Sequence, residues 1–301
     1  MSAILLDIAI RPATLESMET ELTVHTLITK YLAWCGKHRS PRTLEWYAGH
    51  LDNFLDHLGV AKDSPAPDLK PYHVIEWIDA QTGWGDNYSR GAIVAVQRAY
   101  NWAEEMGYIT ATPLRKIKKP PAKRRETYMT PDDFRAIMEL LAEGDPFRDF
   151  FLFVWMTGCR PQEARHIEPR HVELENERIV FPAVESKGKR SKRIIYLQGE
   201  ALEIIQRLMA GRAEGKLFRN RRGLAWSKFA VCNRFYRISQ KTGKRMFCYA
   251  ARHGFGTRKL IQGHDHLTIA ALMGHTDGSM LAKVYSHVDQ NDTHLKRALV
   301  D

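Results

Sequence analysis

The stretch TGCRPQEA, residues 157–164, predicts a sharp turn between two helices, and the second half of this chain is organised around it. Gly158 permits a tight backbone after an apolar run, and Pro161 suits the first position of a new helix. Arg160 would then sit beside free backbone N–H groups, where an anion binds readily, and Glu163 could anchor its guanidinium one turn on. Taken alone, this Arg-x-x-Glu spacing is more often a surface salt bridge.

Further groups suited to phosphate chemistry follow along the chain. Lys187 lies in a charged loop between two strand-like runs, FPAV and IIYL, although such a run is usually a solvated hairpin tip. Arg252 and His253 fall in YAARHGFGTRKL, and His275 and Tyr285 fall in LMGHTDGSMLAKVYSHV. Two arginines, a lysine and a histidine are the groups that would surround a phosphate in transfer, and a tyrosine is a candidate nucleophile.

In this order and spacing the set resembles the tyrosine recombinase, or phage integrase-like, family. The resemblance implies an enzyme that cuts and rejoins DNA at specific sites through a covalent 3′-phosphotyrosine link. Two arginines would bind the phosphate, Lys187 would protonate the leaving 5′-oxygen, and Tyr285 would be the nucleophile. The implied catalytic set is Arg160, Lys187, Tyr249, Arg252, His275 and Tyr285, with Glu163 and His253 in support.

The chain departs from the family pattern in two places. Tyr249 stands where the second arginine motif usually begins with histidine; a tyrosine, with a pKa of about 10, can donate a hydrogen bond but is a poor base. The step from His275 to Tyr285 is one residue longer than usual, which a turn can absorb. In the lysine-rich loop, Lys189 is an alternative to Lys187.

The resemblance also implies the partners. They are double-stranded DNA with specific recombination sites and further copies of this chain, which would be a monomer when free and a tetramer on DNA. Accessory DNA-bending proteins would be additional partners. No cofactor or metal is implied, because two arginines can stabilise the charge of the phosphate in transfer. The histidines at 264 and 266, with Asp265, form the competing pattern for a zinc site, but further ligands at suitable spacing are not evident.

The composition fits a polyanionic partner. The 301 residues carry a formal net charge of +10, and the sequence pI is about 9.4. The four cysteines form no C-x-x-C pair, and no targeting segment or membrane-length apolar run is evident, so we expect a cytoplasmic protein. The candidate DNA-binding residues are Arg115, Lys116, Lys118, Lys119, Lys123, Arg124, Arg125, Lys189 and Arg190.

The expected fold is mainly α, of the α+β class, in two domains. Apolar residues at helical spacing predict a small all-α domain over 21–110, after an extension at 1–20. Residues 111–127 form a basic, proline-rich linker, and 128–301 form a mostly helical domain with a small antiparallel sheet. The resemblance makes these a SAM-like core-binding domain and a tyrosine recombinase catalytic domain, whose tail from about 287 would dock on a neighbour.

Two other functions remain open from the residues alone. A type IB topoisomerase-like enzyme would use the same chemistry to relax supercoils, without specific sites or a tetramer. A non-catalytic DNA-binding or architectural protein would need the basic clusters but not the catalytic set.

Overall fold

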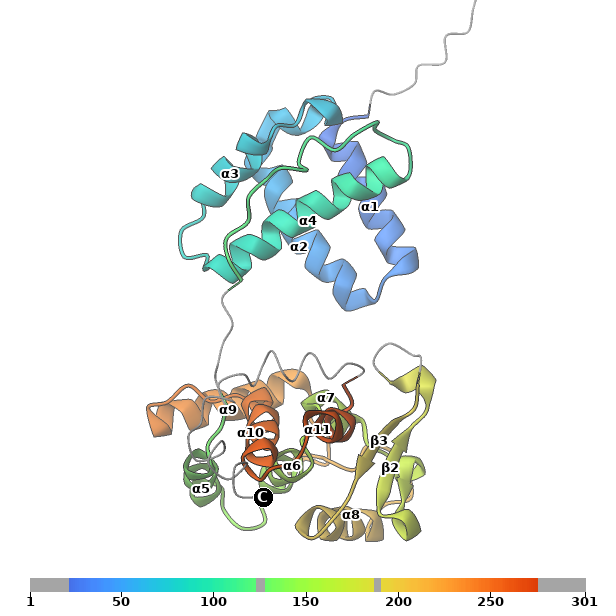
Figure 1. Cartoon of the computed structure of the whole chain (residues 1–301), viewed down its shortest axis with the longest axis vertical. Helices are drawn as coiled ribbons and strands as arrows, with labels where there is room; N and C mark the ends of the chain where they lie inside the picture. The colour runs from blue at the N-terminus through green and yellow to red at the C-terminus, as the bar shows by residue number, and fades with distance from the viewer. Residues whose placement is uncertain (1–21, 123–127, 187–190, 276–301) are drawn as a thin grey trace, which may run out of the picture. The chain divides into compact units, whose positions relative to one another are not determined.

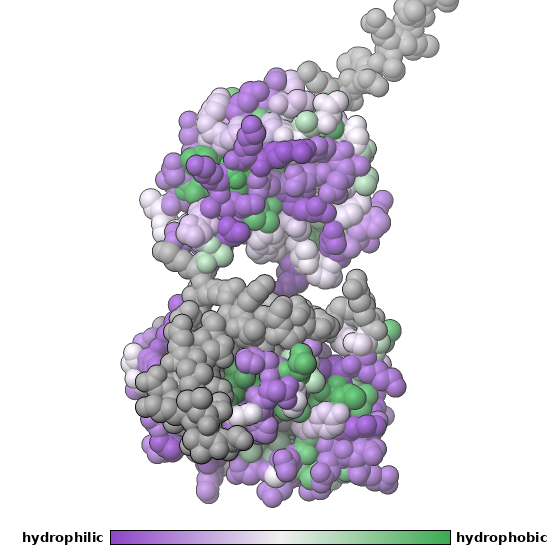
Figure 2. Space-filling model, in the orientation of Figure 1, coloured by the Kyte–Doolittle hydropathy of each residue, from purple (hydrophilic) through white to green (hydrophobic). Residues whose placement is uncertain are grey.

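The computed structural model describes residues 22–122, 128–186 and 191–275. The chain divides into two compact units, residues 1–124 and 125–301, each with its own hydrophobic core (Figure 1). Their surfaces are mostly hydrophilic, with small scattered apolar patches (Figure 2). No helix in the described ranges combines the length and the apolarity needed to cross a membrane. The predicted fold class, mostly helical with a small antiparallel sheet, is confirmed.

The described part of the first unit is helical. Local sequence sets the helix ends: the Ser40 hydroxyl caps the second helix, Pro41 begins it, and Gly59 follows its last residue with a positive φ. The buried faces carry large side chains such as Trp77 and Tyr100. The helices are α1 (Val24–His38), α2 (Pro41–Leu58), α3 (Pro71–Asp79) and α4 (Asp86–Glu105), with 3-10 turns η1 (Gly59–Asp63) and η2 (Ala66–Asp68).

The segment after α4 lies along that helix. Leu114 and Ile117 are buried in the core of the first unit. The side chain of Gln97 donates to the carbonyl of Leu114, and that of Arg90 donates to the carbonyl of Pro120, each at 2.8 Å. The core of the first unit therefore extends beyond residue 110, into the first half of the basic segment expected to be a linker.

The described part of the second unit is mostly helical, with a three-stranded sheet at one side (Figure 1). Local sequence fixes the start of its first helix, because Thr130 and Asp133 cap each other and Pro131 takes the first position. The predicted helix over 278–286 lies outside the described residues. The helices are α5 (Pro131–Leu140), α6 (Pro146–Thr157), α7 (Pro161–His166), α8 (Glu200–Ala210), α9 (Lys228–Thr242), α10 (Cys248–Ile261) and α11 (His266–Met273).

The sheet is antiparallel, in the order β1 (Val172–Glu173), β2 (Arg178–Phe181) and β3 (Arg193–Tyr196). Three short 3-10 turns flank its strands: η3 (Pro169–His171), η4 (Leu174–Asn176) and η5 (Ala183–Glu185). The register pairs Phe181 with Arg193 and Ile179 with Ile195. Because side chains alternate along a strand, Arg193 and Ile195 share the buried face of β3.

Helix α6 lies at the centre of the second unit, in contact with α7, α8 and α10. Most of its apolar side chains are buried, and Phe150, Phe151 and Phe153 are fully so. It ends at Gly158, whose φ of +63° is the left-handed conformation that glycine adopts at low cost. The turn after α6 therefore starts α7 from a fixed point of the core.

Candidate active site

Arg160 occupies the turn between α6 and α7 as the N-cap residue of α7. Its Nη1 donates to Oε1 of Glu163 at 2.7 Å, and its backbone N–H donates to Oε2 of the same carboxylate at 2.9 Å. Its Nη2 donates to the carbonyl of Gly274 at 2.8 Å, 114 residues further along the chain. Its side chain keeps 19% of its surface exposed. Arg160 is thus held from two sides, with part of its guanidinium open to a ligand.

Arg252 lies on α10 and is fully buried. Its Nη1 donates to the carbonyl of Gly158 at 2.7 Å, which brings the two predicted arginine motifs together. Its Nε and Nη2 have no hydrogen-bond partner among the described residues. Burial lowers the pKa of Arg252, and the positive charge of Arg160 lowers it further. A buried cation with two unused donors and like charges beside it favours the binding of an anion.

Arg193, at the start of β3, is a third arginine at this site, and the sequence did not single it out. Its exposure is 6%, and its Nε lies 3.3 Å from Oε2 of Glu163. In the sequence it looks like the end of the charged loop. The signal that could have found it is the alternation of β3, which puts it on the same face as Ile195.

Glu163 joins two of these arginines through one carboxylate. Burial alone would raise its pKa, but the charge of Arg193 and the backbone N–H of Arg160 outweigh burial and lower the pKa. The carboxylate therefore stays ionised. One negative charge among Arg160, Arg193 and Arg252 leaves the site with an excess of positive charge, which suits a phosphodiester.

His275 directly follows Gly274, the left-handed residue that ends α11 at a φ of +68°. Its backbone N–H donates to the carbonyl of Ala270 at 2.8 Å, which fixes the turn. Burial, reinforced by Arg252, Arg160, Arg193 and His253, lowers the pKa of His275 to about 4. The imidazole is therefore neutral near pH 7, with one nitrogen to donate and one to accept. Its Nδ1 is buried without a partner among the described residues.

Tyr249 and His253 lie one turn apart on α10, beside Arg252. Their rings are 5.0 Å apart, edge to face, and the guanidinium carbon of Arg252 lies 5.9 Å from the Tyr249 ring. Tyr249 is 42% exposed. Burial, followed by the charge of Arg252, lowers the pKa of His253. Tyr249, which stands where the family pattern usually has histidine, therefore lies beside Arg252 with an accessible ring.

Two hollows meet at this cluster. One, of about 320 Å³, is lined by Arg160, Arg193, His275 and the residues around Lys192. The other, of about 440 Å³, shares Arg160, Glu163 and Arg193 and extends to Lys216. The first hollow is therefore lined both by Arg160, from the first predicted motif, and by His275, from the last.

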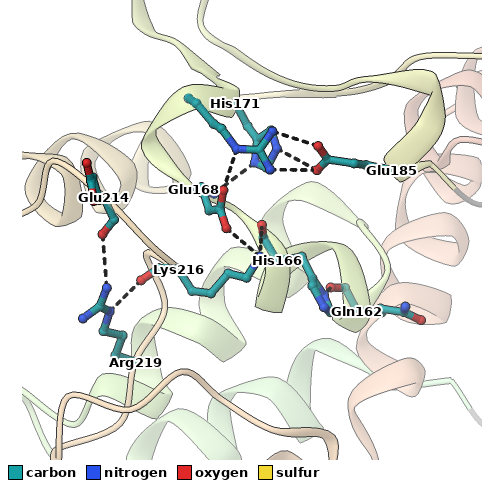
Figure 3. A network of polar contacts seen from close by, with 9 residues as sticks. Gln162, His166, Glu168, His171, Glu185, Glu214, Lys216 and Arg219 are labelled. Atoms are coloured by element: carbon teal, nitrogen blue, oxygen red, sulfur yellow. Dashed lines mark hydrogen bonds and ion pairs between the residues drawn. The ribbon is translucent and has the colours of Figure 1, made fainter.

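A polar network holds the base of the β2–β3 loop (Figure 3). The buried ring of His171 accepts the backbone N–H of Glu168, and its other nitrogen lies 3.0 Å from the carboxylate of Glu185. Ser186, the next residue, donates its hydroxyl to the carbonyl of Ser191 at 2.7 Å. Both ends of the loop are therefore anchored. The loop's own candidates, Lys187, Lys189 and Arg190, lie outside the described residues, as does Tyr285.

The remaining candidates are on the surface or outside the described ranges. Arg115 is paired with Glu104, and Lys119 donates to Gln97. Lys116 and Lys118 are exposed. Lys123, Arg124 and Arg125 lie outside the described residues.

The histidines at 264 and 266 flank the start of α11. The carboxylate of Asp265, between them, accepts the backbone N–H groups of Leu267 and Thr268 and so caps that helix. Within the described ranges, no group of three or more His, Cys, Asp or Glu residues is arranged to hold a metal ion.

Comparison with known proteins identifies the family of this chain. The phage integrase family matches residues 127–292, more than half of the chain. Tyrosine recombinase XerC of Lactobacillus delbrueckii subsp. bulgaricus is 24% identical over 204 residues, covering 63% of this chain and 68% of that protein. Tyrosine recombinase XerC of Thermodesulfovibrio yellowstonii is 26% identical over 278 residues, covering 84% and 88%.

The fold is also found among solved structures. The integrase of transposon Tn1549, in complex with transposon right-end DNA, superposes with a TM-score of 0.73. The two sequences are 18% identical, and the superposition covers 88% of this chain and 95% of the integrase chain.

The matched family and these relatives define an enzyme of DNA strand transfer, in whose fold Arg160 and Arg252 meet at a glycine turn. The chain belongs to the phage integrase family, and it is a site-specific tyrosine recombinase.

Proposed function

We propose that Arg160, Arg252 and His275 bind the scissile phosphate of double-stranded DNA, and that Tyr285 attacks it. The observation that carries this assignment is the convergence of the two arginines on one turn. Arg252 donates to the carbonyl of Gly158, and Arg160 follows two residues later. Both arginines have guanidinium surface or donors left for a ligand.

In the proposed reaction, the Tyr285 hydroxyl loses its proton to solvent as its oxygen forms a bond to phosphorus, while the bond to the 5′-oxygen breaks. The arginines stabilise the charge that develops on the non-bridging oxygens, and Lys187 supplies the proton for the 5′-oxygen. Neutral His275 can donate a hydrogen bond to the phosphate through one nitrogen. The covalent 3′-phosphotyrosine replaces the broken phosphoester bond with a new one to Tyr285. A different 5′-hydroxyl can therefore attack it, reverse the step and exchange strands.

We further propose that the DNA carries specific recombination sites and that the chain, a monomer when free, assembles on them as a tetramer. The excess positive charge of the site and the exposed Lys116 and Lys118 support DNA as the ligand. The first unit would then be the core-binding domain and the second the catalytic domain. An enzyme acting on this substrate would work in the cytoplasm.

A nicked suicide substrate tests the nucleophile, because loss of a short 5′ fragment traps the covalent intermediate. We expect an SDS-stable adduct from the wild type and none from Tyr285→Phe, with DNA binding retained. Tyr236→Phe is the matched control, since Tyr236 is a 65% exposed tyrosine on α9. An adduct from Tyr285→Phe would move the nucleophile to another residue.

The same assay separates the alternative functions. Cleavage should persist in excess EDTA, because the arginines supply the positive charge that a metal would otherwise bring. A topoisomerase-like enzyme would relax supercoiled plasmid without a defined site, whereas a recombinase should join two sites and form a complex of four chains. A non-catalytic DNA-binding protein would give no adduct with any substrate.

A further inference from the structure

Four residues close a ring beneath the candidate phosphate site. Arg193 contacts Oε2 of Glu163 at 3.3 Å, and Oε1 of Glu163 accepts from Arg160 at 2.7 Å. Arg160 donates to the carbonyl of Gly274 at 2.8 Å. The Gly274 backbone in turn lies against the guanidinium of Arg193, so closely that a Cβ there would sit 2.6 Å from its Nε. We call Arg160, Glu163, Arg193 and Gly274 the Glu163 ring.

The ring joins three elements that are far apart in the sequence. Arg160 and Glu163 belong to the start of α7, Arg193 begins β3, and Gly274 ends α11. Each element leads directly to a group of the candidate site. In particular, His275 follows Gly274, so any shift of Gly274 moves the imidazole relative to Arg160.

Arg193 lines both hollows, but it offers little of its side chain to a ligand. Its side chain is 7% exposed, and its Nη1 donates to the backbone carbonyl of Ile194. Its Nη2 is buried without a partner among the described residues. Its planar guanidinium can meet a carboxylate at its edge and a flat glycine backbone on its surface, which the ammonium of lysine cannot do together.

We propose that Arg193 is a positioning residue for strand cleavage, which fixes Arg160 and His275 relative to each other through Glu163 and Gly274. This inference rests on the proposed roles of Arg160 and His275. Loss of Arg193 removes one of the two donors that Oε2 of Glu163 has among the described residues, and it removes the surface against which Gly274 lies. Arg160 still donates to the carbonyl of Gly274, but without the support of Arg193 on Glu163 and Gly274, so Arg160 and His275 are fixed less firmly relative to each other, while the DNA contacts made elsewhere remain.

Single-turnover cleavage of the suicide substrate, at saturating protein, tests the proposal, with DNA affinity measured separately. We expect Arg193→Gln to lower the cleavage rate by about 10², the cost of a displacement near 1 Å, with little change in affinity. Arg193→Lys should restore part of the rate, because it keeps the charge but not the fork. Arg178→Gln is the control, since Arg178 forms a similar pair with Glu173 in the same sheet but is partly exposed.

A double-mutant cycle with Glu163→Gln gives a readout that a purely structural role would not move. If Arg193 acts through Glu163, Arg193→Gln should cost clearly less in the Glu163→Gln background than in the wild type. Full additivity of the two effects would overturn the proposal, as would a cleavage rate within twofold of the wild type. A loss confined to DNA affinity would also overturn it.

Two further results keep the test decisive. If Arg193→Gln unfolds, Arg193→Lys carries the test: an unchanged cleavage rate in the folded variant would contradict the need for a guanidinium. Arg160→Ala and His275→Ala report on the underlying function. If these cleave normally, the proposed function fails; if they fail to cleave while Arg193→Gln cleaves normally, only the role of Arg193 is wrong.

Discussion

The carbonyl oxygen of Gly158 accepts a hydrogen bond of 2.7 Å from Nη1 of Arg252, across 94 residues of sequence. The acceptor sits at the left-handed end of α6, and the donor is fully buried on α10. The bond therefore fixes Arg252 relative to the turn that carries Arg160, so the two arginines are positioned together. Substitution of Gly158 or Arg252 should therefore alter the geometry of the candidate phosphate site.

Gly158→Ala should destabilise the protein strongly. The φ of +63° costs an L-residue about 1–2 kcal/mol, and a Cβ would overlap the ring of Phe255, which adds about 1–3 kcal/mol. Gly243→Ala is the matched control, because its φ is +65° but no atom lies within 4 Å of the new Cβ. Urea unfolding of both variants should show the larger loss at Gly158; equal losses would mean that Phe255 moves aside freely.

Arg252→Met should separate stability from activity. Arg252 is buried among like charges with one hydrogen bond to the described residues, so an apolar side chain of similar length should leave the thermal unfolding midpoint unchanged or raise it. Cleavage should fall by at least about 10²–10³, the cost of one lost donor to a transition-state oxygen. A large drop in the midpoint would instead make the guanidinium a structural necessity.

His275 should contribute to the pH dependence of stability. Its pKa falls from 6.5 to about 4 on folding, because of burial and the charges of Arg252, Arg160, Arg193 and His253. The folded state binds fewer protons than the unfolded state between these values, so this contribution is present above pH 6.5 and is lost as the pH falls toward 4.

Free energies of unfolding at pH 7.5 and pH 5.0 check this expectation. His275→Gln should reduce the difference between the two pH values relative to the wild type. His264→Gln, at an exposed histidine of the same unit, is the control. An unaltered difference in His275→Gln would show that the imidazole is not the group that titrates.

The exposed lysines after α4 should contribute to the salt dependence of DNA binding. Each phosphate contact adds about 0.9 to the slope of log K against log salt, so Lys116→Gln with Lys118→Gln should lower the slope by about 1.8. Arg115→Gln should change it less, because Glu104 already neutralises part of that charge. A slope unchanged in the double variant would leave this segment as a connector only.

Much of the fold could be predicted from local patterns. Ser40 and Thr130 are residue types that favour helix starts and cap the helices that follow them, and apolar side chains repeat at helical spacing on the faces that are buried. The turn at Gly158 and the proximity of Arg160 to Glu163 were also predicted, since they involve neighbours three to five residues apart. Such features depend on backbone preferences that a short segment carries by itself.

The arrangement of the site was less predictable. In the sequence, Arg193 lies at the end of the charged loop. It is nevertheless buried, because the register of β3 against β2 places its side chain on the same buried face as Ile195, in a strand that contacts α11. The position of Arg252 depends on how α10 packs against α6, which it approaches closely at Gly254, where a Cβ would lie 2.8 Å from the ring of Trp155.

The sequence by itself determined the helix ends, the small sheet and the residue types suited to phosphate transfer, because these follow from local conformational preferences and from side-chain chemistry. Only the tertiary structure decided that Arg160, Arg193 and Arg252 converge, that one carboxylate, Glu163, holds two of them, and that His275 is neutral beside them. The physical reason is that burial and Coulomb interactions depend on distances between segments about 100 residues apart. Those distances exist only once α6, α10, α11 and β3 have packed together.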